Sequence, residues 1–424
     1  RTATIVGGGP TGLIAAEHLA RAGVSVAVYD QKPSVARKFL LAGHGGLNIT
    51  HTQEREGFVA RYGASAPRIA PMLDRFSPQD LRDWCASLGE ETFVGSSKRV
   101  FPRSFRANPL VRGWLTRLDD LGVHIHTRQR WTGWREDGGA LTFIGADDAK
   151  QEVRSDVVIF ALGGASWPGL GSDGAWTAPF AARGIQVAPL RPANVGLRVG
   201  WSEVFAARFA GTPVKHLALS VRGRAAASVR GDAMVTKAGI EGGPVYALTV
   251  PIRESLQESG AAILEVDLRP DLSAAELTAR LQSRRPKESG STWLKRTLGL
   301  DAVSISLLRE AGAGSLPQEP HEIAALIKAV PVTSHETMPI DRAISTAGGI
   351  VWGEVNEELM LISAPGTFVA GEMLDWEAPT GGFLLQASFS SGVVAADGAL
   401  GWLDKVAPGR PSAPEAALTR NDHP

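Results

Sequence analysis

The sequence is poor in cysteine, with a single one, Cys85, among 424 residues. One thiol excludes an intramolecular disulfide, a CxxC redox pair, a four-cysteine zinc site and an all-cysteine iron–sulfur cluster. No metal site is predicted. Low cysteine usage is typical of proteins in a reducing cytosol, so a cytoplasmic location is expected. Cys85 itself falls in a predicted helix and is expected to be a packed thiol.

The sequence also lacks a long apolar run, a net charge and an internal repeat. Without eighteen consecutive apolar residues, neither a transmembrane helix nor a membrane partner is expected. The opening residues follow a strand pattern, so no signal peptide is expected. Lys plus Arg and Asp plus Glu both number 44. This zero net charge argues against a dedicated polyanion-binding protein.

What the sequence has in excess is glycine, with 48 residues, and these mark turns between regular segments. Residues 3–7 predict a strand, 11–22 a helix and 24–30 a second strand, which is a βαβ opening typical of a parallel sheet. Another apolar strand, within 156–164, runs into paired glycines. Further helices are predicted near 78–88 and 108–121, and further strands near 123–127, 131–135 and 140–144.

The later segments differ in glycine content and in the periodicity of their apolar residues. Residues 36–51 are glycine-rich and predict a long functional loop. Alternating segments over 195–250 predict antiparallel strands. Strands and glycines are expected again from Pro339 to Gly392, and a loosely ordered tail from about residue 405. Between these regions the periodicity predicts helices at 273–283, 291–298, 301–311 and 320–329.

The turn after the first strand carries a dinucleotide fingerprint. Gly7, Gly9 and Gly12 stand in G-x-G-x-x-G register, with Pro10 and Thr11 between the last two. Gly7 makes the tight turn, Gly9 lets the backbone approach a pyrophosphate, and the helix N-terminus offers free N–H groups. Asp30 ends the second strand, where it can accept hydrogen bonds from a ribose diol. The alternative is a glycine turn in an unrelated βαβ unit.

Two features favour FAD over NAD as the dinucleotide. The chain has one such fingerprint, so no second domain for a separate nicotinamide is visible. A second glycine-containing group of segments, which we term the second glycine constellation, lies near the C-terminal end over 368–375, 379–383 and 386–392. There Gly381 and Gly382 open a small-residue helix that can point N–H groups and a dipole at the carbonyl edge of a flavin. The alternative is a purely structural strand–turn–helix.

These motifs together resemble a known family, the BaiN/RdsA-type NAD(P)/FAD-dependent oxidoreductases, also called the aminoacetone-oxidase family. The resemblance rests on residues 7–12, 37–50, 99–102, 162–168, 371–375, 379–382, 386 and 390–392. They span nearly the whole chain in the order of the family. One loop departs from it: where members often read Thr-Gly-Asn-Gly-Arg-Cys-Asn, residues 42–48 read Ala-Gly-His-Gly-Gly-Leu-Asn.

The resemblance implies an α/β protein of three parts. A Rossmann-like FAD-binding domain is built from both chain ends, 1–192 and 342–404. A β-barrel-like insert covers 193–270 and 331–341, and it carries a helical subdomain at 271–330. The last segment, 405–424, is a tail.

The resemblance also places the glycine-rich loop near the flavin. His44 and Asn48 are therefore the candidate catalytic residues, His44 as a general acid or base. The alternatives are a surface histidine and an asparagine that only braces the loop. The predicted cofactor-binding residues are Gly7, Gly9, Pro10, Thr11, Gly12, Asp30, Gln31, Lys32, Lys38, Gly43, Gly45, Trp131, Ala161, Gly163, Gly371, Glu372, Asp375, Gly381, Gly382 and Phe383.

The predicted function is hydride transfer between FAD and a small organic substrate, with NAD(P)H or oxygen as electron donor or acceptor. One alternative is reduction of a uridine in ribosomal RNA, with RNA docking on two basic stretches at 98–117 and 280–296. The alternative for both stretches is an ordinary charged surface exposed to solvent, with no RNA bound. Another alternative is a flavin-binding scaffold without enzymatic activity.

Overall fold

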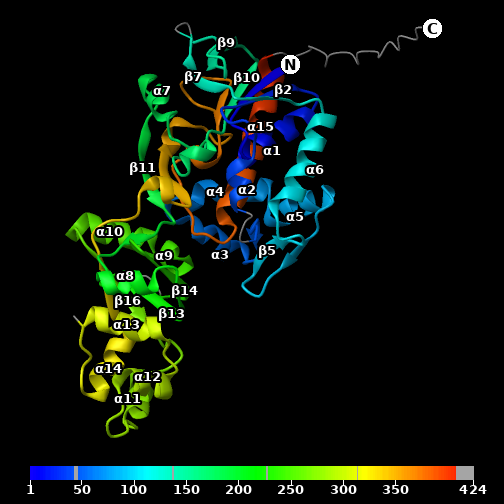
Figure 1. Ribbon diagram of the computed structural model, residues 1–424. Helices are drawn as coiled ribbons and strands as arrows, with labels where there is room; N and C mark the ends of the chain where they lie inside the picture. The colour runs from blue at the N-terminus through cyan, green and yellow to red at the C-terminus, as the bar shows by residue number, and fades with distance from the viewer. Residues whose placement is uncertain (43–45, 136–137, 226–227, 313, 407–424) are drawn as a thin grey trace. The chain divides into compact units, whose positions relative to one another are not determined.

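The computed structural model describes residues 1–42, 46–135, 138–225, 228–312 and 314–406 (Figure 1). The chain forms two compact units. The first combines Arg1–Arg191 with the chain from Thr346 onward, and the second is Pro192–Ser345. The predicted His44, Gly43 and Gly45 lie outside the described residues. The finer domain boundaries stay a prediction.

The first unit contains a five-stranded parallel sheet, as the βαβ opening predicts. Its strand order is β19-β10-β1-β2-β6, and every neighbouring pair is parallel. Helix α1 (Pro10–Arg21) connects β1 to β2. The predicted Rossmann-like arrangement is thus confirmed. The strands are β1 (Thr2–Val6), β2 (Ser25–Asp30), β6 (His124–Thr127), β10 (Val157–Phe160) and β19 (Thr367–Val369).

The parallel sheet joins both ends of the chain through helix α15 (Phe383–Val406), which packs along α1. A Cβ added at Gly392 would lie 2.5 Å from the Thr11 carbonyl oxygen, so glycine lets the two helix backbones approach closely. By length and composition α15 passes the test for a membrane span, but 72% of its most apolar window is buried inside the protein. Such burial is what a core helix of a globular protein shows.

Two small antiparallel sheets and further helices complete the first unit. The sheets have the orders β3-β5-β4 and β7-β8-β9. The sheet strands are β3 (Thr50–His51), β4 (Thr92–Val94), β5 (Arg99–Pro102), β7 (Arg130–Trp134), β8 (Leu141–Ile144) and β9 (Lys150–Val153). The helices are α2 (Arg37–Ala42), α3 (Arg55–Val59), α4 (Ala66–Arg75), α5 (Pro78–Ser87), α6 (Ala107–Asp120) and α7 (Thr177–Ala182). Strands β11 (Val187–Ala193) and β18 (Ser345–Ile350) pair where the chain passes between the units.

The second unit is built on a six-stranded antiparallel sheet of order β12-β15-β14-β13-β16-β17. The sheet nearly closes on itself, because Leu197 in its first strand bridges Thr337, just after its last. The Met338 N–H also donates to the Gly196 carbonyl at 2.8 Å. The predicted barrel-like insert is confirmed. Its strands are β12 (Leu197–Arg198), β13 (Pro213–Val221), β14 (Val229–Thr236), β15 (Gly239–Glu241), β16 (Ala262–Asp267) and β17 (Val330–Ser334).

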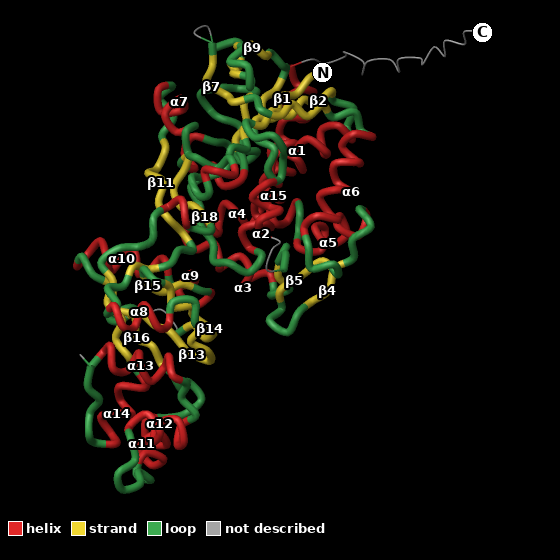
Figure 2. Tube along the Cα trace, viewed as in Figure 1, coloured by secondary structure: helices red, strands yellow, loops and turns green. Residues whose placement is uncertain are grey.

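The four helices predicted in the second unit are present, and Figure 2 shows α11, α12 and α14 grouped at one end of it. Ser273, Ser289 and Asp301 cap three of them by accepting a backbone N–H three residues on. They are α11 (Ala274–Leu281), α12 (Gly290–Leu298), α13 (Ala302–Ala311) and α14 (Pro320–Lys328). Helices α8 (Glu203–Phe209), α9 (Gly243–Ala247) and α10 (Thr249–Ser259) were not predicted.

One sequence prediction was wrong in detail. The glycine-rich loop 36–51 was expected to be irregular, yet it contains α2 and β3. Phe39 on α2 is 1% exposed, so packing against the core stabilises this short helix. The small-residue helix expected after Gly381 and Gly382 is confirmed, because α15 begins at Phe383, and the strands end before it and not at Gly392. Cys85 is buried in α5, as predicted.

Candidate functional site

In the glycine turn between β1 and α1, two glycines leave no space for a side chain and one has open space next to it. An added Cβ would clash with the Ala161 carbonyl at Gly7 and with the Gly7 carbonyl at Gly12. At Gly9, which precedes the first helical residue Pro10, nothing lies within 4 Å of that Cβ position. The first N–H groups of a helix have no partner within the helix. The turn is therefore a cradle with free donors, which fits a pyrophosphate.

Asp30 stands at the end of β2, next to this cradle. One carboxylate oxygen accepts the Gly8 N–H and the other accepts the Lys32 N–H, both at 2.8 Å. Burial raises the pKa of Asp30, and these two N–H groups, with the charges of Lys32 and Arg37, oppose the rise. Each oxygen keeps a lone pair for a further donor. The arrangement fits the hydroxyls of a ribose.

An ion pair joins the two ends of the chain beside the turn that follows β10. The Lys38 ammonium donates to Ser166 Oγ at 2.6 Å and to Glu372 Oε2 at 2.9 Å. Glu372 also accepts the Thr346 N–H at 2.8 Å and the Gly164 N–H at 3.3 Å. Lys38 is thus paired, and Glu372 connects four segments. The sequence analysis missed Ser166 and Thr346, although Ser166 stands in the glycine motif after β10.

The second glycine constellation lies against the first. A Cβ added at Gly371 would lie 2.5 Å from Thr11 Oγ1. A Cβ added at Gly382 would lie 2.5 Å from the Thr50 carbonyl. Thr50 also donates its hydroxyl to Gln386 Oε1 at 2.7 Å. The N-terminus of α15 is therefore held directly against the strand that follows the glycine-rich loop.

Asn48 is braced and also holds a free acceptor. Its Nδ2 donates to the carbonyls of Thr50 at 2.8 Å and Val100 at 3.0 Å. These two acceptors fix the orientation of the amide. Its Oδ1 is buried and has no hydrogen-bond partner among the described residues. A buried acceptor without a donor fits a ligand N–H or hydroxyl.

The remaining predicted residues divide into two groups. Gly163 follows β10 with φ 71° and accepts Trp176 Nε1 at 2.8 Å, and Ala161 supports the glycine turn. Gln31 donates to the Gly171 carbonyl at 2.9 Å, and Lys32 packs on Gly171. These residues line the carboxyl edge of the parallel sheet, where nucleotides bind in such folds.

The second group packs into the protein. Trp131 stacks edgewise on Phe160 and Phe180, with ring centroids 4.8 and 5.8 Å away. Phe383 is 4% exposed and stacks on His51 at 5.2 Å. Both side chains pack in the core, but Trp131 Nε1 is buried and has no hydrogen-bond partner among the described residues. A role of these two residues in cofactor binding stays a prediction.

Asp375 belongs to the same region of the first unit. Burial raises the pKa of this carboxyl and Glu377 raises it further, whereas Arg191 and a backbone N–H of Gly348 lower it. Its own N–H donates to the Ile350 carbonyl at 2.9 Å. A partly desolvated carboxylate of this kind fits hydrogen bonding to a polyol chain.

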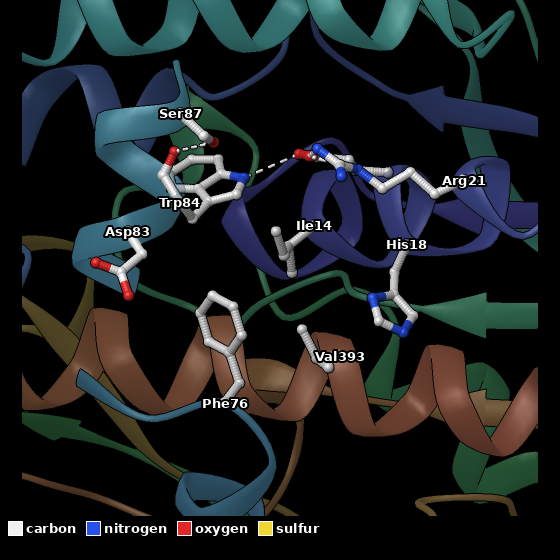
Figure 3. Close-up of a pocket in the computed structure, with 9 residues that line it drawn as sticks. Ile14, His18, Arg21, Phe76, Asp83, Trp84, Ser87 and Val393 are labelled. Carbon is white, nitrogen blue, oxygen red and sulfur yellow. Dashed lines mark hydrogen bonds and ion pairs between the residues drawn. The ribbon is translucent and has the colours of Figure 1, made fainter. Parts of the chain in front are cut away.

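A separate cavity of about 320 Å³ lies farther along α1, lined by residues of α1, α5 and α15 together with Phe76 (Figure 3). Its floor is apolar, from Ile14, Phe76, Trp84 and Val393. Two of its charged residues are paired with each other: Glu17 accepts Trp84 Nε1 at 2.9 Å and Arg21 at 2.8 Å. This arrangement stabilises the packing of α1 on its neighbours.

The fold and these contacts define a Rossmann-type dinucleotide-binding protein whose site is assembled from both chain ends. The chain belongs to the HI0933-like protein Rossmann domain family, which matches residues 1–398. The family resemblance drawn from the motifs is thus confirmed. The protein is a flavoprotein oxidoreductase and its cofactor is FAD, so the scaffold alternative is set aside.

Two curated relatives match most of the chain. The 3-dehydro-bile acid delta(4,6)-reductase of Clostridium scindens is 28% identical over 403 residues, covering 92% of this chain and 97% of the relative. The ribosomal RNA dihydrouridine synthase of Haemophilus influenzae is 24% identical over 406 residues, covering 92% and 96%.

Solved structures share the fold. The 3-ketosteroid delta1-dehydrogenase of Sterolibacterium denitrificans has a TM-score of 0.53 at 12% identity, covering 94% of this chain and 99% of that one. A flavocytochrome c3 fumarate reductase has a TM-score of 0.51 at 15% identity, covering 95% and 78%. At these identities the likeness concerns the fold alone.

Proposed function

We propose that this protein transfers a hydride between FAD and a small organic substrate, and that it works as a reductase of a carbon–carbon double bond conjugated to a carbonyl. The observation that carries the proposal is the meeting of the two glycine constellations within one unit. Gly371 lies against Thr11 and Gly382 against Thr50. One site can therefore hold the pyrophosphate at one helix N-terminus and the ring at another.

Each part of the site has a distinct task in this proposal. The cradle at Gly9 and the N-terminus of α1 hold the pyrophosphate, and Asp30 accepts the ribose hydroxyls. Lys38 and Glu372 fix the turn after β10, and Asp375 accepts from the ribityl chain. When bound, FAD supplies the hydride transfer itself.

The chain contributes the proton and the orientation. Asn48 Oδ1 is the acceptor that orients a ring or substrate N–H or hydroxyl. His44, in the same loop, holds the proton that the substrate gains or loses at an oxygen or carbon. The glycines of this loop let the backbone approach a planar ring without a Cβ in the way.

The substrate class draws on the relatives' names. Both describe a reduction, one of a 3-dehydro-bile acid and one that yields dihydrouridine. A 3-dehydro compound with delta(4,6) double bonds and a uridine each have a carbon–carbon double bond conjugated to a carbonyl, and each reduction adds hydrogen to it. A small molecule is favoured over a uridine, because position 47 is a fully buried leucine and offers no thiol as a proton donor.

Cys85, the one cysteine of the chain, cannot serve as the proton donor either. Cys85 is buried, and burial, with a smaller effect of Glu90, raises the pKa of its thiol to about 12. The basic stretch 280–296 is also a poor RNA-binding surface in this proposal, because Arg296 binds Glu288 at 2.8 Å through two nitrogens and part of its charge is neutralised.

We also propose that the enzyme works in the cytoplasm and that NAD(P)H reduces the cofactor.

Anaerobic half-reactions test the proposal. The holoenzyme is reduced with NADH or NADPH, then mixed with a small-molecule enone, with oxygen, or with a uridine-containing ribosomal RNA fragment, and flavin absorbance reports each reoxidation. In a separate arm the oxidised holoenzyme is mixed with an amine, and flavin absorbance reports any reduction. The proposal expects fast reoxidation by the enone, with one molar equivalent of substrate reduced per flavin, and no reduction by the amine. Reoxidation by the RNA fragment alone would establish the alternative function instead.

A further inference from the structure

Three phenylalanines, which we term the aromatic triad, lie on or just after the β3-β5-β4 sheet: Phe93 on β4, Phe101 on β5 and Phe105. Phe93 and Phe101 face each other across β4 and β5, with ring centroids 5.8 Å apart at 28°. Phe105 packs on both, at 4.9 and 5.7 Å. Phe105 is nevertheless 50% exposed. The triad is thus a preassembled apolar surface that remains open to solvent.

Phe105 is also held in an unfavourable backbone conformation. Its φ is 57°, in the left-handed region that a bulky side chain rarely adopts. Hydrogen bonds hold it there: its N–H donates to the Pro102 carbonyl at 2.9 Å, and its carbonyl accepts the Leu47 N–H at 3.0 Å. Strain of this kind is concentrated at functional sites. The second bond ties Phe105 to the loop that carries Asn48.

The triad lies beside the proposed flavin region. The Cβ position of Gly46 is 3.6 Å from the Phe105 ring and 3.8 Å from the Phe101 ring. On the same small sheet, Arg99 pairs with His51 across β5 and β3. Arg99 Nε is 3.7 Å from the Cβ position of Gly381, at the turn that opens α15. The triad is therefore next to Gly46 of the glycine-rich loop, and Arg99 is next to Gly381 at the start of α15.

Next to the triad, in the part of the chain that the structure describes, cations without an ion pair outnumber free acids. Among the described residues no ion pair is found for Lys98, Arg99 or Arg106, whereas Arg103 is neutralised by Glu91 at 3.0 Å. Glu90, the other nearby acid, accepts the Ser104 N–H. Burial lowers the pKa of the neighbouring His51, a hydrogen bond with the Ser97 backbone opposes this, and the cations Arg61, Arg99 and Lys98 lower the pKa further. A cationic edge therefore borders the apolar triad.

We propose that the aromatic triad and Arg99 form the substrate platform of this enzyme, and that its substrate is a flat, largely apolar molecule with an anionic group. The flat body lies on Phe105 and Phe101, and the anion is bound by Arg99 with Lys98 beside it. The inference rests on the proposed function, since it names the substrate class of the same site.

Equilibrium binding to the oxidised holoenzyme tests the platform without requiring turnover. The probes are 3-oxo-4-androstene-17β-carboxylic acid and its methyl ester, which share the flat enone body and differ in charge. Isothermal calorimetry gives each dissociation constant. The variants are Phe105→Ala, Arg99→Gln and, as matched control, Arg103→Gln, whose arginine stands near the same strand but is already paired.

The platform predicts a distinct pattern for each variant. Phe105→Ala weakens acid and ester alike, on the order of tenfold, because it removes apolar contact. Arg99→Gln weakens the acid by about tenfold and leaves the ester unchanged. Arg103→Gln changes neither. Circular dichroism and flavin content confirm that each variant is folded and loaded.

Three results would overturn the platform: unchanged binding in Phe105→Ala, an unchanged ratio of acid to ester in Arg99→Gln, or tighter binding of a short uridine-containing RNA that depends steeply on salt. The predicted pattern in an enzyme whose reduced flavin no enone reoxidises would support the platform and contradict the proposed function. The two claims can therefore fail separately.

Discussion

Lys38 and Glu372 stand 334 positions apart in the chain and form an ion pair with 2.9 Å between Nζ and Oε2. The pair lies beside the turn after β10, and its side chains are only 29% and 16% exposed. It connects the N-terminal and C-terminal segments of the nucleotide-binding unit. Because FAD contacts both segments in our proposal, the pair couples folding of this unit to retention of the cofactor.

Removing one partner of this pair should weaken both stability and FAD retention. We expect Lys38→Met and Glu372→Gln each to lower the free energy of unfolding by about 1–3 kcal/mol, since a partly buried partner is left unpaired. Urea denaturation of the apo- and holoproteins measures the change. Arg55→Gln is the control, because its pair with Asp74 is exposed to solvent and should contribute little to stability. Equal effects of all three variants would contradict the coupling.

The glycines of the first turn should separate cofactor binding from folding. Gly9→Val should fold normally, since the position has φ −82° and open space, yet lose FAD because its side chain fills the cradle. Gly12→Ala should instead destabilise the fold, because the new Cβ clashes with the Gly7 carbonyl. Thermal unfolding of the apoproteins and the flavin-to-protein absorbance ratio measure the two effects. Full FAD content in folded Gly9→Val would show that the pyrophosphate binds elsewhere.

Glu17 should be important for stability and unimportant for FAD binding. It is 2% exposed, accepts Trp84 Nε1 and pairs with Arg21 and Arg117. We expect Glu17→Leu to cost about 3–5 kcal/mol in unfolding free energy, because it removes the buried carboxylate that two arginines and an indole N–H share. Asp83→Asn, on the rim of the same cavity, is the control and should be nearly neutral. Urea denaturation decides; a change under about 1 kcal/mol for Glu17→Leu would contradict the role given to the network.

Cys85 should be chemically inert in the folded enzyme. Its thiol is buried with a pKa of about 12, so almost no thiolate exists at neutral pH. Iodoacetamide at pH 8 should label Cys85 only after urea is added, as intact-mass measurement would show. Rapid labelling of the native holoenzyme would mean that α5 opens readily or that the thiol is exposed.

Local signals in the sequence predicted the elements whose contacts are local. The βαβ opening is specified by an apolar strand, a glycine turn and a helix within 30 residues, and the serine and aspartate caps mark α11, α12 and α13. Contacts between distant segments were not predictable in this way. No pattern near Lys38 shows that Glu372 and Ser166 will surround it.

The wrong details have the same origin. The segment 36–51 is rich in glycine and was expected to be a loop, yet it contains the helix α2, whose Phe39 is 1% exposed. Phe105 was passed over because its exposure and its positive φ appear only in three dimensions. The motif at 7–12 predicted the cradle, but not that Gly9 alone of its three register glycines faces open space.

The central claim is that the loop 42–50, and not Cys85, controls the chemistry over the flavin. Anaerobic stopped-flow measurement of flavin reduction and reoxidation in His44→Ala, Asn48→Ala and Cys85→Ala tests it most directly. We predict that His44→Ala keeps FAD and loses about 10²–10⁴ in the rate of one half-reaction, as removal of a positioned proton donor does. Asn48→Ala should slow the same step, and Cys85→Ala should match the parent. Parent-like rates in His44→Ala, with turnover abolished in Cys85→Ala, would contradict the claim.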